Sequence, residues 1–169
     1  MNSTWSDTVK TKDGEVIYTW HPNKIVDGIR EHQVYGFCIN REGKVTLGRD
    51  KEETRYTLLG GRVDPGENAR EALIREFKEE VQFEPKDIEL LGSLEVEVRD
   101  NSGKVSDHHQ QVRFTCKIDD PGEFTPEKDG WETVERIFVD PKELPNYIDW
   151  LHYPTGKIQY QEFLATLDR

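Results

Sequence analysis

The sequence predicts an α+β domain with more sheet than helix. Its 169 residues include only 3 Ala, against 13 Val, 10 Ile and 12 Thr, and branched side chains favour strands over helices. Short apolar segments recur between turns rich in Gly, Pro and Asp, whereas helical spacing of apolar residues is clear in only two segments. No repeat or long linker divides the chain, so we expect one domain over residues 1–169.

Four strands are predicted in the first third of the chain, at residues 16–20, 34–39, 44–47 and 56–59. The second and third form a hairpin by composition, because Arg41-Glu42-Gly43 between them favours a turn. The fourth is short and apolar, and we expect it to enter a glycine-rich loop at Gly60-Gly61.

The clearest helix begins at Asn68 and runs to about Val81. Asn68 is a favoured N-cap residue, and Glu71 three residues later completes a capping box. Leu73, Phe77 and Val81 follow one another at intervals of four, so they form the face that packs on the core. The opposite stripe is mostly acidic.

The second half of the chain predicts two more strands, a polar connection and a final helix. Residues 88–98 form one long strand or two with a kink at Gly92, and residues 112–118 alternate like a half-buried antiparallel strand. Between them, residues 99–109 form a polar hairpin connection with its turn at 101–103. A further strand at 134–139, a short helix capped by Asp140-Pro141 and an amphipathic helix at 158–167 complete the chain.

The charge and apolar pattern excludes several classes of protein. No window holds the roughly 20 apolar residues of a membrane span, and the first 15 residues are polar, so we expect a soluble, cytoplasmic protein. Cys38 and Cys116 lie within apolar segments, which indicates two small buried side chains, although a disulfide stays open. The net charge of −11 argues against binding to a nucleic-acid duplex. A small phosphorylated ligand remains compatible if a metal ion supplies positive charge.

Three carboxylates on the first helix carry the chemistry. Glu76, Glu79 and Glu80 occupy positions i, i+3 and i+4, so all three project from one face and repel one another. A hard divalent cation such as Mg²⁺ or Mn²⁺, which prefers oxygen ligands, removes this conflict. The plainer alternative is that an acidic protein simply exposes an acidic helix face.

The residues around these carboxylates decide between the two readings. Five residues separate Gly61 from Glu67, and seven more lead to Arg75-Glu76, followed by Phe77, Lys78 and Glu79-Glu80. This pattern resembles the Nudix box, and it departs from the box only where Gln82 replaces the usual Gly at the end of the helix. The resemblance implies an α/β/α sandwich with a mixed, largely antiparallel central sheet. It also implies metal-dependent hydrolysis of a diphosphate linkage in a nucleoside triphosphate, sugar nucleotide or dinucleotide.

The resemblance assigns roles by position. Glu76, Glu79 and Glu80 correspond to the metal-binding carboxylates, one of which acts as a base, and the Gly60 carbonyl corresponds to a further ligand. Glu67 and Arg75 correspond to orienting groups. Because members of the family often take another ligand or base from a later loop, Glu132 is our candidate for that position.

Other side chains are weaker candidates for substrate contact. Arg55, Arg62 and Arg113 are expected either to meet phosphate or to be ordinary surface arginines. Trp20 is a candidate for stacking on a nucleobase, as are Trp131, Tyr18 and Tyr35, although such side chains are more often part of the core. Asp107-His108-His109 offers metal ligands, but its expected place in a polar loop favours substrate contact or solvation.

Two alternatives to a hydrolase stay open at this point. One is an isoprenoid diphosphate isomerase, which the absence of a Cys near the box disfavours, and the other is a catalytically silent binding module with the same fold. A homodimer is a further expectation, because family members are often dimers and the N-terminal strand offers an edge for pairing.

Overall fold

The computed structural model describes residues 3–119, 122–125 and 133–169. Its strands are β1 (Trp5–Thr11), β2 (Gly14–Pro22), β3 (Glu31–Ile39), β4 (Val45–Asp50), β5 (Thr57–Arg62), β6 (Lys86–Asp100), β7 (Val105–Lys117) and β8 (Thr133–Val139). Within the described residues they form one eight-stranded sheet in the order β1-β2-β6-β7-β3-β5-β4-β8. The pairing of β3 with β7 is parallel and the other pairings are antiparallel, so the expected mixed, largely antiparallel sheet is confirmed.

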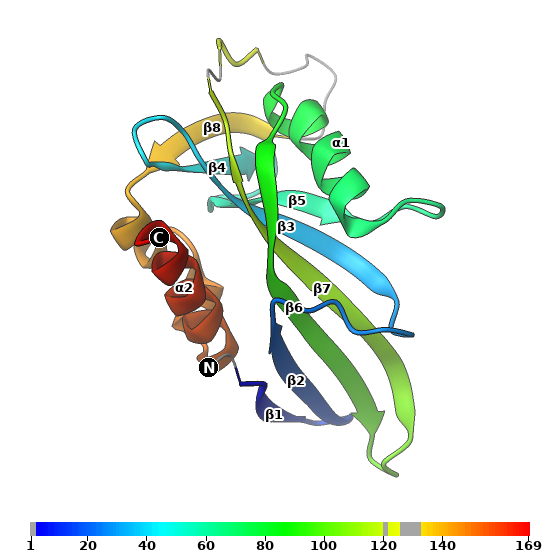
Figure 1. Cartoon of the computed structure of the whole chain (residues 1–169). Helices are drawn as coiled ribbons and strands as arrows, with labels where there is room; N and C mark the ends of the chain where they lie inside the picture. Colours follow the sequence, from blue (N-terminus) through cyan, green and yellow to red (C-terminus); the bar gives the residue numbers. More distant parts are fainter. Residues whose placement is uncertain (1–2, 120–121, 126–132) are drawn as a thin grey trace.

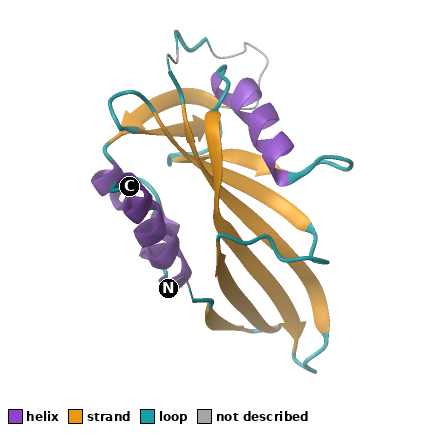
Figure 2. Cartoon of the chain, viewed as in Figure 1, coloured by secondary structure: helices purple, strands orange, loops and turns teal. Residues whose placement is uncertain are grey.

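Two α-helices cover opposite faces of this sheet (Figure 1). They are α1 (Ala69–Val81) and α2 (Pro154–Leu167), and two short 3₁₀ turns, η1 (Pro141–Asn146) and η2 (Asp149–His152), lead into α2. Figure 2 shows that strands make up most of the molecule, as the composition predicts. In the described part of the chain, no helix is long and apolar enough to cross a membrane.

Alternation along the strands divides the core into two layers. On β3, Val34 and Cys38 pack with α1, whereas Phe37 packs on the other face, where its ring stacks on Phe163 of α2 with 4.5 Å between ring centres. Both cysteines are buried free thiols, as expected. Because both faces of the central strands are covered by helices, their polar residues are shielded as well.

Strand β1 was not predicted and most strands are longer than expected, and three further differences concern the glycines, the histidines and α2. Strand β5 continues through Gly60-Gly61, which we expected in a loop, because the missing side chains let β3 and α1 approach this stretch closely. Strand β7 begins at Val105, so residues 107–109 pair with β6 and are not part of a loop. Helix α2 begins at Pro154, a favoured first-turn residue, four residues before the expected start.

Candidate active site

The ends of α1 are fixed by side chains. Asn68 Oδ1 accepts the Glu71 N–H at 2.9 Å, which confirms the predicted N-cap, and Glu31 of β3 accepts the Ala69 N–H at 3.0 Å. The last turn ends at Gln82, whose backbone is left-handed (φ 62°), the conformation for which Gly is favoured. The Gln82 side chain accepts the Thr125 N–H at 3.0 Å and donates to the Thr125 carbonyl, which ties this segment to the helix end.

Arg75 is the centre of a carboxylate cluster on α1. Its Nε and Nη2 donate to the two oxygens of Glu67 at 3.2 and 2.6 Å, which is a bidentate pair. Its Nη1 donates to Glu76 at 3.1 Å and to Glu79 at 3.5 Å. Its Nη2 also donates to the Arg62 carbonyl at 2.9 Å, so the same side chain ties α1 to the end of β5.

The ion pair between Glu67 and Arg75 shifts the pKa of each partner in the direction that favours its charged form. Hydrogen bonds from Arg75 hold the pKa of the Glu67 carboxyl below its usual value, and the hydrogen bonds to Glu67 raise the pKa of Arg75. Glu67 and Glu76 are 15% and 16% exposed, whereas Glu79 is 49% exposed. The cluster is therefore shielded from solvent at Glu67 and Glu76 and open to solvent at Glu79.

Strand β5 lies against the same carboxylates. A Cβ on Gly61 would overlap the Glu76 carboxylate, so only glycine leaves room for that group. The neighbouring Gly60 N–H donates to Glu80 Oε2 at 3.2 Å. About 20 residues separate β5 from the end of α1 in the sequence. The fold nevertheless places the two glycines of β5 next to the carboxylates of α1.

The donor set fits a hard divalent cation. Glu76, Glu79 and Glu80 supply only carboxylate oxygens, and the Gly60 backbone is next to them. The missing side chain of Gly61 leaves the room that the Glu76 carboxylate occupies.

The weaker sequence candidates for substrate or metal contact lie in different environments. Trp20 is fully buried in the α2-side core, so its predicted contact with substrate is wrong. Arg55 is exposed and forms an ion pair with Asp149. Arg62 is exposed at the end of β5, and Glu132 lies outside the described residues.

A second group of possible metal ligands lies on β6 and β7. Ligand atoms of Glu95, Glu97 and His108 are within 4.8 Å of one another. Glu95 pairs with His108 at 2.7 Å and with His21 at 2.8 Å, and Arg99 pairs with Glu97 at 2.9 Å. Each of these three side chains thus has a hydrogen-bond or ion-pair partner within the protein.

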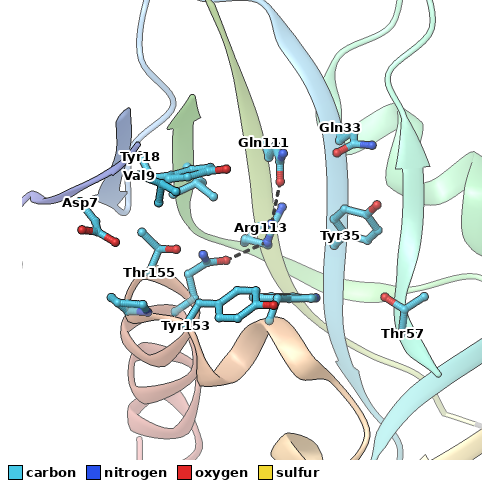
Figure 3. A pocket seen from close by; sticks show the side chains of 14 residues that line it. Asp7, Val9, Tyr18, Gln33, Tyr35, Thr57, Gln111, Arg113, Tyr153 and Thr155 are labelled. Atoms are coloured by element: carbon cyan, nitrogen blue, oxygen red, sulfur yellow. Dashed lines mark hydrogen bonds between the residues drawn. The ribbon is translucent and has the colours of Figure 1, made fainter. Parts of the chain in front are cut away.

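The burial of one sequence candidate, Arg113, is not evident from local sequence. Arg113 is only 3% exposed and lines a cavity of about 670 Å³ on the α2 face (Figure 3). Burial lowers its pKa to about 10. The alternation of residues 112–118 suggested an outward-facing arginine, but β7 lies between β6 and β3 with helices over both faces. An arginine within a strand that is expected to lie at the centre of a sheet is the sequence signal that would have indicated this burial.

Comparison with known proteins agrees with this geometry. The NUDIX domain family matches residues 30–165. The chain belongs to the Nudix family. Among curated relatives, the RNA pyrophosphohydrolase of Shigella boydii is 31% identical over 124 residues, which cover 64% of this Nudix chain and 70% of that protein. The NAD-capped RNA hydrolase NudC of Pseudomonas fluorescens is 53% identical over 57 residues, 32% of this chain and 21% of the length of that relative.

Solved structures support the same Nudix fold. A Bacillus subtilis pyrophosphohydrolase superposes with a TM-score of 0.68 at 19% identity, and the match covers 95% of this chain and 97% of that one. At this identity the likeness concerns the fold alone. With the family and its pyrophosphohydrolase relatives, the chain is a Nudix pyrophosphohydrolase by class, and the family generally uses divalent metal ions.

Proposed function

We propose that this Nudix enzyme hydrolyses a diphosphate linkage in a nucleoside triphosphate group, carried by a free nucleotide or by the 5′ end of an RNA. The observation that carries the proposal is the complete arrangement around Arg75, in which Glu67 and Glu76 are held by one guanidinium beside Glu79 and Glu80. The RNA pyrophosphohydrolases among the relatives support the choice of a nucleotide with a 5′ triphosphate.

The proposed metal site consists of Glu76, Glu79, Glu80 and the Gly60 carbonyl, with Mg²⁺ or Mn²⁺ as the ion. A bound ion supplies positive charge that neutralises phosphate oxygens and lowers the pKa of water. Arg75 keeps the Glu76 carboxylate oriented toward β5, and Glu67 keeps Arg75 in place. One glutamate of the cluster accepts a proton from the attacking water, a task for a carboxylate within hydrogen-bond reach.

The direct test measures phosphate and pyrophosphate release from GTP, ATP, a sugar nucleotide, a dinucleotide and a 5′-triphosphorylated RNA. Each is assayed with Mg²⁺, with chelator and with the Glu80→Gln variant. Glutamine keeps an oxygen acceptor for the Gly60 N–H but loses the negative charge, so the fold survives. We expect Glu80→Gln to lower kcat by about 10²- to 10⁴-fold, the usual range for removal of an acid–base group.

The matched control is Glu84→Gln, which removes an exposed carboxylate just beyond α1. We expect it to hydrolyse the same substrates at the wild-type rate. Near wild-type turnover by Glu80→Gln would refute its assigned role. Absence of metal-dependent release from every substrate would favour the silent binding module over the hydrolase. Conversion of an isoprenoid diphosphate, assayed beside the panel, into a product of the same mass with a shifted double bond would indicate an isomerase.

A further inference from the structure

The part of the sheet that extends beyond α1 carries polar side chains on its open face. Helix α1 packs on β5, β3 and β8, whereas β1, β2 and the adjoining ends of β6 and β7 extend away from it (Figure 1). Trp20 of β2 and Leu94 of β6 belong to the α2-side core. Because alternate residues of a strand face opposite sides, the next residues, His21 and Glu95, lie on the open face.

Two histidines of this face meet one carboxylate. Nε2 of His21 is 2.8 Å from Glu95 Oε1, and Nε2 of His108 on β7 is 2.7 Å from Glu95 Oε2. Glu97, two residues further along β6, is the cross-strand partner of His108. Ligand atoms of Glu95, Glu97 and His108 all lie within 4.8 Å of one another. Two imidazoles and two carboxylates from three paired strands thus form one group, which we call the His–Glu cluster.

A backbone segment borders the His–Glu cluster. Residues 23–30, which lead from β2 to β3, cross the sheet over β6 and β7 (Figure 1). Ser93 is the cross-strand partner of His21, and its hydroxyl donates to the backbone of this segment. Gln110 is the cross-strand partner of Glu95, and its side chain makes three hydrogen bonds to the same segment. The side chains of His21 and Glu95 are only 15% and 20% exposed, so these donors are largely shielded from water.

The hydrogen bonds inside the cluster are bonds that a cation can replace. A neutral imidazole carries its proton on one ring nitrogen and a lone pair on the other. When the proton is on Nδ1, the Nε2 lone pair of each histidine is free beside the Glu95 carboxylate. Arg99 pairs with Glu97 at 2.9 Å, but its side chain is 38% exposed and can turn to solvent. A divalent cation would then attract both carboxylates and accept both lone pairs.

The donor atoms distinguish this cluster from the carboxylates on α1. Imidazole nitrogen suits Zn²⁺ and other late transition metals, whereas Mg²⁺ prefers oxygen. Zn²⁺ usually takes four ligands in a tetrahedron with bonds of about 2.0–2.2 Å, which places the ligand atoms roughly 3.4 Å apart. Atoms that already lie within 4.8 Å of one another reach this spacing by small side-chain rotations, with the strands in place.

We propose that His21, Glu95, Glu97 and His108 form a second metal site on the open face of the sheet, with Zn²⁺ as its ion. All four ligands come from the protein, which is the arrangement of a structural zinc site. A bound ion joins β2, β6 and β7 and stabilises the folded chain. The site shares no residue with the carboxylate cluster on α1 and does not depend on the proposed function.

The test is equilibrium binding of Zn²⁺ to the full chain, freed of metal with a chelator and then kept in a large excess of Mg²⁺. The Mg²⁺ competes for the oxygen-only carboxylates on α1 and not for imidazole nitrogen. By calorimetry we expect one Zn²⁺ to bind per chain. The urea-unfolding midpoint should rise further when Zn²⁺ is added to the Mg²⁺-loaded protein. In ¹⁵N spectra of the wild type, the Nε2 resonances of His21 and His108 should shift.

Two variants connect Zn²⁺ binding to the cluster. His108→Gln removes one imidazole, and Glu97→Gln removes one carboxylate charge. Each should weaken Zn²⁺ binding by at least about 10- to 100-fold, the cost of losing even a supporting contact of a metal ligand. The matched control His152→Gln makes the same change at an exposed histidine of η2, and it should bind Zn²⁺ like the wild type.

The outcomes separate this site from the proposed function. No Zn²⁺ binding in excess Mg²⁺, wild-type affinity in His108→Gln or Glu97→Gln, or an equal loss in His152→Gln overturns the second site. Nε2 resonances of His21 and His108 that do not respond to Zn²⁺ also overturn it, and this measurement needs no variant to fold. Zn²⁺ binding at the cluster without any Mg²⁺-dependent hydrolysis supports the site and refutes the function, and hydrolysis without such binding does the reverse.

Discussion

Arg75 and Arg113 lie on opposite sides of the sheet, and the surroundings of the two are opposite. Arg75 on α1 lies within ion-pair distance of four carboxylates, those of Asp64, Glu67, Glu76 and Glu79, and hydrogen bonds to Glu67 raise its pKa. Arg113 on β7 has two amide oxygens and a backbone carbonyl as acceptors, and burial lowers its pKa to about 10. One cation is more stable in the fold than in water, and the other is less stable.

This difference indicates different roles. The bonds of Arg75 are complete without a ligand, so the side chain serves to hold Glu67 and Glu76 in place. Among the described residues, the hydrogen bonds of Arg113 use three of its five N–H groups, so a ligand can add bonds to this side chain. Carboxylates prepared for a cation thus face one side of the sheet, and donors prepared for an acceptor-rich ligand face the other.

Among the variants compared below, Gly61→Ala is expected to have the largest effect. It disturbs only the side of the sheet that carries the carboxylate cluster. The new Cβ would overlap the end of the flexible Glu76 side chain, which can turn away while the backbone stays in place. Because a displacement of about 1 Å at a reacting group costs about 10²-fold in rate, we expect kcat to fall about 100-fold. Steady-state kinetics measure the loss, and thermal melting should show little change in stability.

The adjacent Gly60→Ala is the matched comparison. Its Cβ would overlap the Val34 carbonyl, a backbone atom, and the positive φ of 153° adds strain, so this variant should lose stability as well as activity. A folded Gly61→Ala protein with unchanged kcat would contradict the role of Glu76.

The next effect concerns stability and compares the two arginines directly. Arg75→Met leaves the carboxylates of Glu67 and Glu76, both mostly shielded, without their cation. We expect the free energy of unfolding to fall by about 1.5–3 kcal/mol, the range for hydrogen bonds to charged groups. For Arg113→Met we expect a loss below about 1 kcal/mol, because removal of an uncompensated buried charge offsets the lost bonds to Gln159 and Gln111.

Urea unfolding of both variants in the absence of nucleotide measures these values. A loss for Arg113→Met as large as that for Arg75→Met would assign Arg113 to the structure of the free protein.

Sequence predicted the carboxylate side of this comparison well, and the reason is local geometry. The spacing of Glu76, Glu79 and Glu80 on one helix puts them on one face without any knowledge of the rest of the fold. The cap at Asn68 and the end at Val81 follow from the same local rules. The two glycines were recognised as close-approach positions, although they lie in a strand.

The pocket side could not be predicted, because it depends on which strands become neighbours. Arg113 meets Tyr35 through the parallel β3–β7 pairing and Gln159 through the packing of α2, contacts that span 46 residues or more. Alternation along β7 distinguishes two faces but not whether each face is covered. Trp20 was misjudged for the same reason, since its burial depends on α2.

A smaller effect is expected in the acid limb of stability. Because Arg75 lowers the pKa of folded Glu67 below its usual value of 4.5, the ion pair stabilises the fold above about pH 4.5 and this contribution is lost as the pH falls through the lower, folded value. Glu67→Gln lacks this titration. We expect its unfolding midpoint to approach that of the wild type as the pH falls below about 4.5. Parallel curves for the two proteins would contradict the strength of the pair.

The smallest effect is expected at the end of α1, where Gln82 replaces the glycine of the Nudix box. Its left-handed backbone costs about 1–2 kcal/mol, which Gly would recover, but its side chain makes two hydrogen bonds to the Thr125 backbone, each worth about 0.5–1.5 kcal/mol. These contributions nearly cancel, so Gln82→Gly should change the free energy of unfolding by less than about 1 kcal/mol. Gln82→Ala keeps the backbone strain and loses both hydrogen bonds, so it should be the less stable of the two variants. Urea unfolding ranks the two, and hydrogen exchange at the Thr125 amide should be faster in both. If Gln82→Gly were as unstable as Gln82→Ala, the side-chain bonds and not the backbone would determine how this helix ends.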